Sequence, residues 1–174
     1  MKNLRINLIG IFVACISLVA CSGNDGEAGA AGPAGANGNA NVQGYTYTLL
    51  TSDWSNGDAV VSIPQLSKEI AENGQVAVFW TRDALGTDSI TWNPLPYSFG
   101  VTVNGSLTFL SLQTAIQVGS VTVQSRISNI SRIDYNQNSS LRVVLIPSSN
   151  LVEDIDLGDY EAVKSVYGLK EEGF

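Results

Sequence analysis

The stretch that decides the fold runs from Tyr97 to Leu112 and reads YSFGVTVNGSLTFLSL. An Asn-Gly pair between two runs of β-branched and aromatic residues predicts a hairpin with a two-residue type I′ loop. That loop sets the register, which pairs Tyr97 with Leu112, Phe99 with Leu110, Val101 with Thr108 and Val103 with Ser106. Because these mostly apolar side chains share one face of the hairpin, we expect that face to belong to the core.

Short apolar runs separated by turn residues surround this hairpin, a texture typical of β-sandwiches and barrels. We expect strands over 42–51, 59–63, 75–81 and 141–146, and one or two more of unknown register within 116–133. The run 75–81 (QVAVFWT) is the most apolar and should be central. Only 14% of the residues are charged, which also favours strands. We therefore predict an all-β fold, a single β-sandwich (immunoglobulin-like or jelly-roll-like) over residues 42–174.

Two short helices should accompany the strands. Apolar residues four positions apart in the segment 66–70 predict one or two helical turns, ended by Gly74 in the left-handed conformation. Residues 159–167 carry apolar side chains at three- and four-residue spacing, which predicts a C-terminal helix with Asp156 or Gly158 near its start.

The N-terminus has the features of a targeting segment. Lys2 and Arg5 precede the apolar run 6–20, which is shorter than the roughly 20 residues that a membrane-spanning helix needs. The run ends in Leu-Val-Ala-Cys at 18–21, which resembles the lipobox of bacterial lipoproteins. This resemblance implies a signal peptide over residues 1–20 that is removed, and an acyl-modified Cys21 that anchors the chain in a membrane.

A glycine tract follows the lipobox. Six glycines recur at every third position from Gly23 to Gly38, the spacing that a collagen triple helix requires. Only Pro33 supplies an imino acid, however, and collagen-like stability goes with far more proline. Residues 21–41 could form a flexible Gly-x-y tether or a short triple helix in a trimer. We expect the tether, and a monomer.

Composition excludes several classes of function. The chain has no histidine, and its two cysteines would be lost with the signal (Cys15) or acylated (Cys21). The anchored form would then have neither a disulfide nor Ser-His-Asp or Cys-His catalysis, nor a common zinc site. From Cys21 onward the chain has seven basic and 16 acidic residues, a formal charge of −9, which argues against binding to nucleic acid.

Carboxylates are the remaining chemical groups. A glycoside hydrolase needs two of them across a cleft, and the candidates by residue type are Glu69, Glu72, Glu153 and Glu161. Asp154, Asp156 and Asp159 partly follow a calcium-loop rhythm, without the bidentate glutamate that such loops use. Acidic residues also stabilise a helix start, so capping is the preferred interpretation for these, and a plain turn for Asp53 to Asp58. We expect neither an enzyme nor a cofactor.

Three tryptophans are the candidates for ligand binding. Trp54 lies in a turn, and Trp80 and Trp92 flank the loop 81–91. An exposed indole can stack on a sugar, although in small β-domains such rings more often pack in the core. A carbohydrate-binding platform of Trp54, Trp80 and Trp92 is therefore the alternative to a protein-interaction or adhesion module, and a glycoside hydrolase is a remote one.

Six stretches distributed along the chain are GNANV (38–42), IPQL (63–66), GQVAVFW (74–80), WNPLPY (92–97), RVVLIP (142–147) and DYEAVK (159–164). With the lipobox and the glycine tract, they resemble a group of uncharacterised Gram-negative lipoproteins with a collagen-like tract and a small β-domain. The resemblance implies location and architecture but no activity. The glycine tract departs from the family in being short and poor in proline. Ser22 after the cysteine, with Asp25 and Glu27 close by, favours the outer membrane, with its cell-surface side an open possibility.

Overall fold

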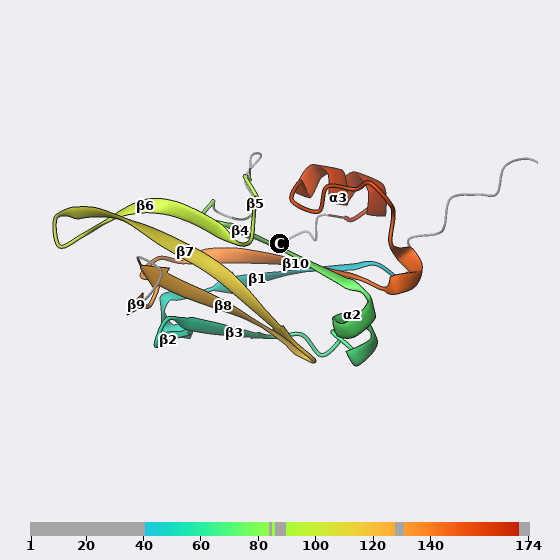
Figure 1. The fold of residues 1–174 in the computed structure, drawn as a ribbon, viewed down its shortest axis with the longest axis horizontal. Coiled ribbons are helices and arrows are strands. Elements are labelled where there is room, and N and C mark those ends of the chain that lie inside the picture. The colour runs from blue at the N-terminus through green and yellow to red at the C-terminus, as the bar shows by residue number, and fades with distance from the viewer. Residues whose placement is uncertain (1–40, 84, 86–89, 128–130, 171–174) are drawn as a thin grey trace, which may run out of the picture. The chain divides into compact units, whose positions relative to one another are not determined.

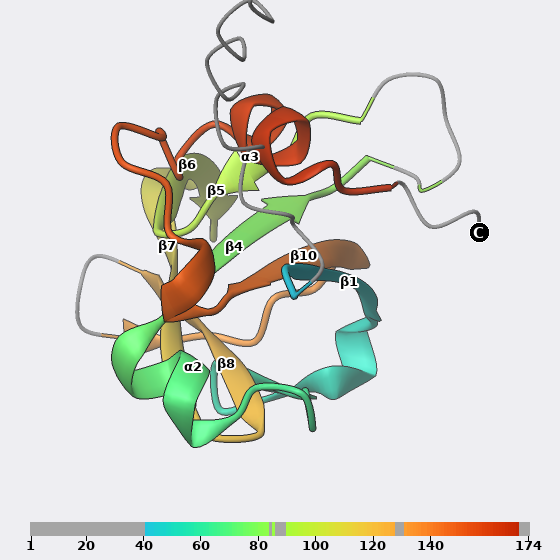
Figure 2. The same cartoon turned by 90° about the vertical axis from the view of Figure 1, so that its right-hand side faces the viewer.

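The computed structural model describes residues 41–83, 85, 90–127 and 131–170. Within these residues two antiparallel sheets pack face to face, and a short C-terminal helix covers the outside of the smaller one (Figures 1 and 2). The all-β sandwich expected from the sequence is confirmed. The signal segment, Cys21 and most of the Gly-x-y tract lie outside the described residues.

Each sheet combines strands that are distant in the sequence. The smaller sheet has the order β1 (Gln43–Leu49), β10 (Ser139–Ile146), β4 (Gln75–Thr81) and β5 (Asn93–Pro94). The larger sheet has the order β2 (Trp54–Ser55), β3 (Asp58–Ser62), β8 (Ser120–Ile127), β7 (Ser106–Gln117) and β6 (Tyr97–Val103), with β9 (Ser131–Arg132) beside β8. Two 3₁₀ turns, η1 (Thr51–Asp53) and η2 (Ser148–Asn150), lie in the connections.

The β6–β7 hairpin has the predicted loop and register. Asn104 and Gly105 both have positive φ, 50° and 78°, and Tyr97 pairs with Leu112. The predicted inner face belongs to the core, since Leu110 and Leu112 are buried and their β6 partners pack against the same cluster.

Strand β10 is buried at every position, which explains the apolar run from Val143 to Ile146 at its end. Leu141, Val143 and Leu145 face the larger sheet, in a cluster that we call the inner core. Val144 and Ile146 face the opposite way and pack against helix α3, in a second cluster that we call the outer core. A strand covered on both faces has no polar side, so its hydrophobic pattern does not alternate. The predicted central position of β4 is confirmed as well, because β4 lies between β10 and β5.

Helix α3 (Tyr160–Tyr167) follows the predicted pattern. Tyr160, Val163 and Tyr167 are its buried residues and complete the outer core. The cap is Asp159, immediately after the region in which we expected it, and Gly168 ends the helix with a φ of 60°.

Helix α2 (Lys68–Asn73) is also present, but the role expected for Gly74 is wrong. Ser67 caps the start, and the glycine at the end has a φ of −91°, outside the left-handed region. Glycine is needed there for space, because a Cβ atom at Gly74 would collide with the carbonyl oxygen of Ile146 on β10. The helix can therefore lie directly against the end of the central strand.

The polar segment from Asp53 to Asp58 contains a second tight hairpin rather than a simple turn. Strands β2 and β3 are joined by Asn56 and Gly57, whose φ values are 53° and 76°. Gly57 is buried: its N–H donates to Asp134 Oδ1 at 2.6 Å, and its carbonyl accepts from Ser125 N at 2.7 Å. This hairpin thus joins β2 and β3 to β8 and to the segment after β9.

Arg142 is the charged residue of β10. Its side chain is buried, with Nη1 donating to Thr46 Oγ1 at 2.6 Å and Nη2 to the carbonyl of Lys170 at 2.9 Å. A Cβ atom at Gly44 would lie 2.8 Å from Nη2, so glycine makes room for the guanidinium. Arg142 therefore ties β10 both to β1 and to the residues that follow α3.

The two type I′ glycines provide a matched stability test. Gly57 and Gly105 have nearly the same φ, but a Cβ at Gly57 would lie 2.7 Å from Arg132 Cβ and 2.9 Å from two backbone atoms, whereas a Cβ at Gly105 meets nothing within 4 Å. We expect Gly105→Ala to lower the free energy of unfolding by about 1 kcal/mol through backbone strain alone. Gly57→Ala should lower the free energy of unfolding by about 2–5 kcal/mol, because the added methyl group would also overpack against its neighbours. Urea denaturation measures both, and equal losses would contradict the packing described around Gly57.

Candidate interaction surface

Two of the three predicted platform residues are not on the surface. Trp54 is 5% exposed and Trp80 is 1% exposed, and both pack in the inner core around Tyr135, each with its ring centroid 5.8 Å from the tyrosine ring. Trp92 is half-buried and lies against Tyr160 of α3, at 5.6 Å. The alternative of a platform is therefore wrong for Trp54 and Trp80, and the preferred interpretation of packing in the core holds for both, because large rings fill the space between two small sheets. The three indoles do not share one face.

Arg82 lies beside this aromatic cluster, at the edge of the inner core. The guanidinium carbon of Arg82 lies 5.0 Å from the centroid of the Phe99 ring and 5.8 Å from that of Trp80, within range of a cation–π interaction. Burial raises the pKa of the Tyr135 phenol above its usual value, and the charge and hydrogen bond of Arg82 partly oppose this. The cluster is thus a packed edge of the core.

The calcium candidates are engaged with the backbone. Asp159 Oδ1 accepts hydrogen bonds from Glu161 N at 2.9 Å and Ala162 N at 3.2 Å, the N-cap role. Asp156 Oδ1 accepts from Gly158 N at 2.8 Å, while Asp154 is an exposed residue in a left-handed turn. In the part of the chain that the structure describes, no three His, Cys, Asp or Glu residues are grouped so that they could hold a metal.

The glutamates considered for glycoside hydrolysis lie on exposed helix and loop surfaces, Glu69 and Glu72 together on α2 and the others elsewhere. Glu69 Oε1 accepts from Ser148 Oγ at 2.9 Å, Glu72 pairs with Lys68 at 3.7 Å, and Glu161 with Lys164 at 3.9 Å. Glu153 lies exposed between η2 and α3. Their positions suit solvated helix and loop surfaces.

An open groove of about 480 Å³ runs between β1 and β3, and two carboxylates line it. Asp53 Oδ2 accepts from Leu50 N at 2.8 Å, and Asp58 Oδ2 binds Arg132 Nη1 at 2.6 Å. Both acids have structural partners, so the groove does not combine a free acid with a free base.

The outer face of the larger sheet is the most distinctive surface. Residues 89–125 contain no Asp, Glu, Lys or Arg, and they include all of β6 and β7 and most of β8. Strand alternation turns their polar and small side chains outward. The uncharged run from residue 89 to residue 125 is the sequence signal that could have identified this face.

Two large apolar side chains stand out from this face near the hairpin tip. Leu107 is 77% exposed and Phe109 is 66% exposed. Opposite them on β6, Thr102 pairs with Leu107 and Gly100 with Phe109. The space above Gly100 is open, since a Cβ there would meet only the end of the Leu107 side chain, at 3.5 Å. We call Gly100, Thr102, Leu107 and Phe109 the hairpin patch.

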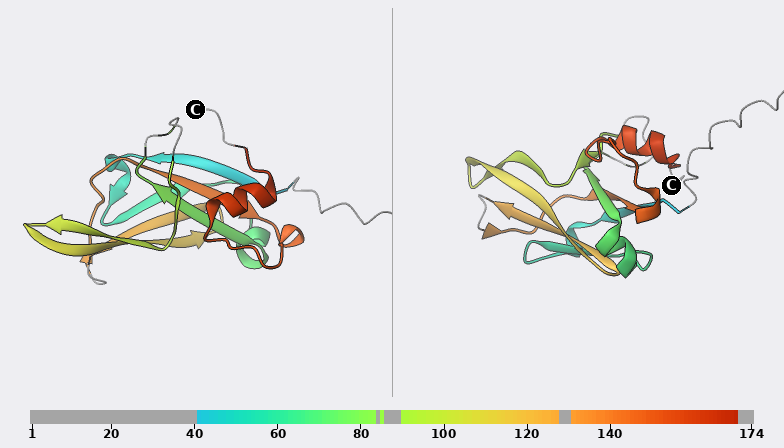
Figure 3. Two further views of the ribbon diagram at one scale, coloured as in Figure 1. Left: turned by 90° about the horizontal axis from the view of Figure 1, so that it is seen from above. Right: turned by 45° about the vertical axis from the view of Figure 1, so that its right-hand side comes forward.

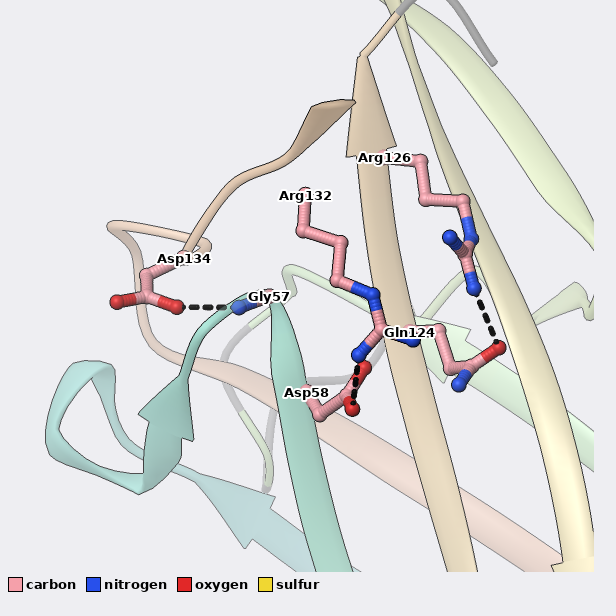
Figure 4. Close-up of polar contacts among 6 residues, drawn as sticks. All are labelled: Gly57, Asp58, Gln124, Arg126, Arg132 and Asp134. Carbon is pink, nitrogen blue, oxygen red and sulfur yellow. Dashed lines mark hydrogen bonds and ion pairs between the residues drawn. The ribbon is translucent and has the colours of Figure 1, made fainter. Parts of the chain in front are cut away.

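Charged side chains of the same sheet gather around β3, β8 and β9 (Figure 4). Arg132 of β9 pairs with Asp58 of β3, and Arg126 Nη2 donates to Oε1 of Gln124 on its own strand, β8, at 3.1 Å. The Arg132–Asp58 pair thus ties β9 to β3, and backbone pairing joins β9 to β8. Val60 of β3, 66% exposed, is a further apolar side chain on this sheet outside the hairpin patch.

Comparisons with known proteins give no relative from which a site could be transferred: no protein-family model, no curated protein and no solved structure matches this chain. The candidate site therefore rests on this surface alone.

The Asp58–Arg132 pair should contribute little to stability. The two side chains are 28% and 36% exposed, and pairs in contact with water are worth about 0–1 kcal/mol. Asp58→Asn should lower the free energy of unfolding by less than about 1 kcal/mol, and the difference from the unchanged chain should shrink near 1 M salt. Denaturation at low and high salt measures this. A large, salt-independent loss would show that the pair is a buried structural element.

Proposed function

We propose that this chain is a lipid-anchored protein of the cell envelope that displays an interaction or adhesion module: a β-sandwich that binds partners and catalyses no reaction. The anchor would be the lipid on Cys21, and residues 1–20 the removed signal. The resemblance to collagen-like lipoproteins and the residues after Cys21 support an outer-membrane location. No helix among the described residues is long and apolar enough to span a membrane.

The position of the hairpin relative to the start of the sandwich carries this proposal. Strand β1 begins at the end of the sandwich where α2 and α3 lie, and the tip of the β6–β7 hairpin lies at the opposite end (Figures 1 and 3). A tether joined to residue 41 would thus enter the sandwich at the end opposite the hairpin patch and would leave the patch accessible. Such a tether, residues 22–41, could extend about 60 Å.

The exposure of the patch supports binding over catalysis. Large apolar residues exposed together mark interaction sites in soluble domains, and the acidic groups considered for catalysis are engaged or dispersed. The carbohydrate alternative is weakened, because Trp54 and Trp80 cannot stack on a ligand from within the core.

Replacing each cysteine separately tests the anchor. Cys21→Ala should abolish incorporation of labelled fatty acid and move the protein from the membrane to the soluble fraction, because no other group would hold it there. Cys15→Ala is the matched control, since that residue lies in the apolar signal, and it should remain labelled and membrane-bound. Continued fatty-acid labelling of Cys21→Ala would refute the lipoprotein assignment.

A further inference from the structure

We propose that a pocket between the start of β1 and the residues that follow α3 binds a carboxylate group. The pocket has a volume of about 420 Å³. Its position differs from that of the hairpin patch, and binding there would not depend on the proposed lipid anchor. The lining includes Val42, Gly44, Arg142, Tyr167, Leu169 and Lys170.

Arg142 supplies a buried positive charge to this pocket. The residue is 2% exposed, and its guanidinium donates to two neutral acceptors, Thr46 Oγ1 and the carbonyl oxygen of Lys170. Among the described residues, no Asp or Glu forms an ion pair with it. The carbonyl end of α3 offsets part of the charge through the helix dipole. A buried cation without a counter-charge is nevertheless unfavourable, so the pocket is suited to an anion.

Two hydrogen-bond donors of the pocket point to the same kind of ligand. Arg142 Nε and the Tyr167 hydroxyl are buried, and within the part of the chain that the structure describes neither has a hydrogen-bond partner. Tyr167 is 3% exposed. Buried donors without an acceptor destabilise a fold, and native structures contain few of them. Two in one pocket therefore indicate a ligand that supplies acceptors.

A carboxylate matches this set of groups better than a phosphate. It has one negative charge and two oxygen atoms, to set against one buried guanidinium and two unpartnered donors. A phosphate monoester carries a charge of about −1.5 to −2 at pH 7, and the second cation of the pocket, Lys170, is exposed to water. Val42 and Leu169 can contact the carbon atoms of an organic acid.

The carboxylate can come from two sources. One is a small organic acid from solution. The other is the chain itself, because Glu171 and Glu172 directly follow Lys170 in the sequence. Both sources would present the same group to Arg142 and Tyr167, and replacing the two glutamates distinguishes them.

NMR titration of the ¹⁵N-labelled full-length chain with sodium butyrate tests the site. The Nε–H signal of Arg142 should shift and reach saturation, because the carboxylate accepts its hydrogen bond. Butyramide, which has a similar shape and no charge, and sodium chloride at equal ionic strength should not reproduce the shift. A shift that appears only after Glu171→Gln and Glu172→Gln are combined would identify the chain's own glutamates as the carboxylate source. No shift in either protein, or an equal shift with butyramide, would overturn the proposal.

Tyr167→Phe tests the second donor, and Tyr160→Phe on the same helix is its control. Tyr160 is also buried but does not line the pocket. Both variants are made in the background that binds butyrate. Tyr167→Phe should weaken butyrate binding about tenfold, because a hydrogen bond to a charged group is lost. It should not lower the melting temperature without butyrate, since the hydroxyl has no partner among the described residues.

Tyr160→Phe should leave the affinity for butyrate unchanged. Unchanged affinity in Tyr167→Phe would show that its hydroxyl does not contact the ligand. A lower melting temperature of Tyr167→Phe without butyrate would show that the hydroxyl has a structural partner within the fold. Either result would refute the proposed site.

Discussion

The architecture depends on the burial of strand β10 on both of its faces. Alternate side chains of this strand enter the inner core, between the sheets, and the outer core, beneath α3. The strand also pairs with β1 on one side and with β4 on the other. Each buried aliphatic side chain contributes about 1.5–3 kcal/mol to the free energy of folding. The side chains of this one strand therefore stabilise both the packing of the two sheets and the docking of the C-terminal helix.

This arrangement determines which groups are left for function. Trp54 and Trp80 are buried in the inner core. Asp156 and Asp159 accept backbone hydrogen bonds near the start of α3, and Asp58 pairs with Arg132. The smaller sheet is covered on its outer face by α3. Among the described residues no helix covers the outer face of the larger sheet, and its hairpin lies at the end farthest from the start of β1. The fold thus leaves a surface suited to binding, with the hairpin patch as part of it.

Sequence patterns predicted those elements whose signals are local. Asn104-Gly105 lies between two long alternating strands, so loop and register followed directly. Asn56-Gly57 is the same dipeptide, but only two strand residues precede it. Its sequence pattern therefore predicts only a turn. The turn at Val118-Gly119 has a weaker signal, which left β8 without a register. Gly74 and the two buried tryptophans depend on residues far away in the chain, including Ile146 and Tyr135. Such contacts cannot be deduced from spacing.

In the function that we propose, a lipid on Cys21 holds this sandwich at a membrane. Intact-mass spectrometry of the native protein purified from membranes tests the anchor most directly. We predict a chain that begins at Cys21 and carries the added mass of a diacylglyceryl group and a further acyl chain. A chain that still begins at Met1, or one with an unmodified Cys21 thiol, would contradict the account.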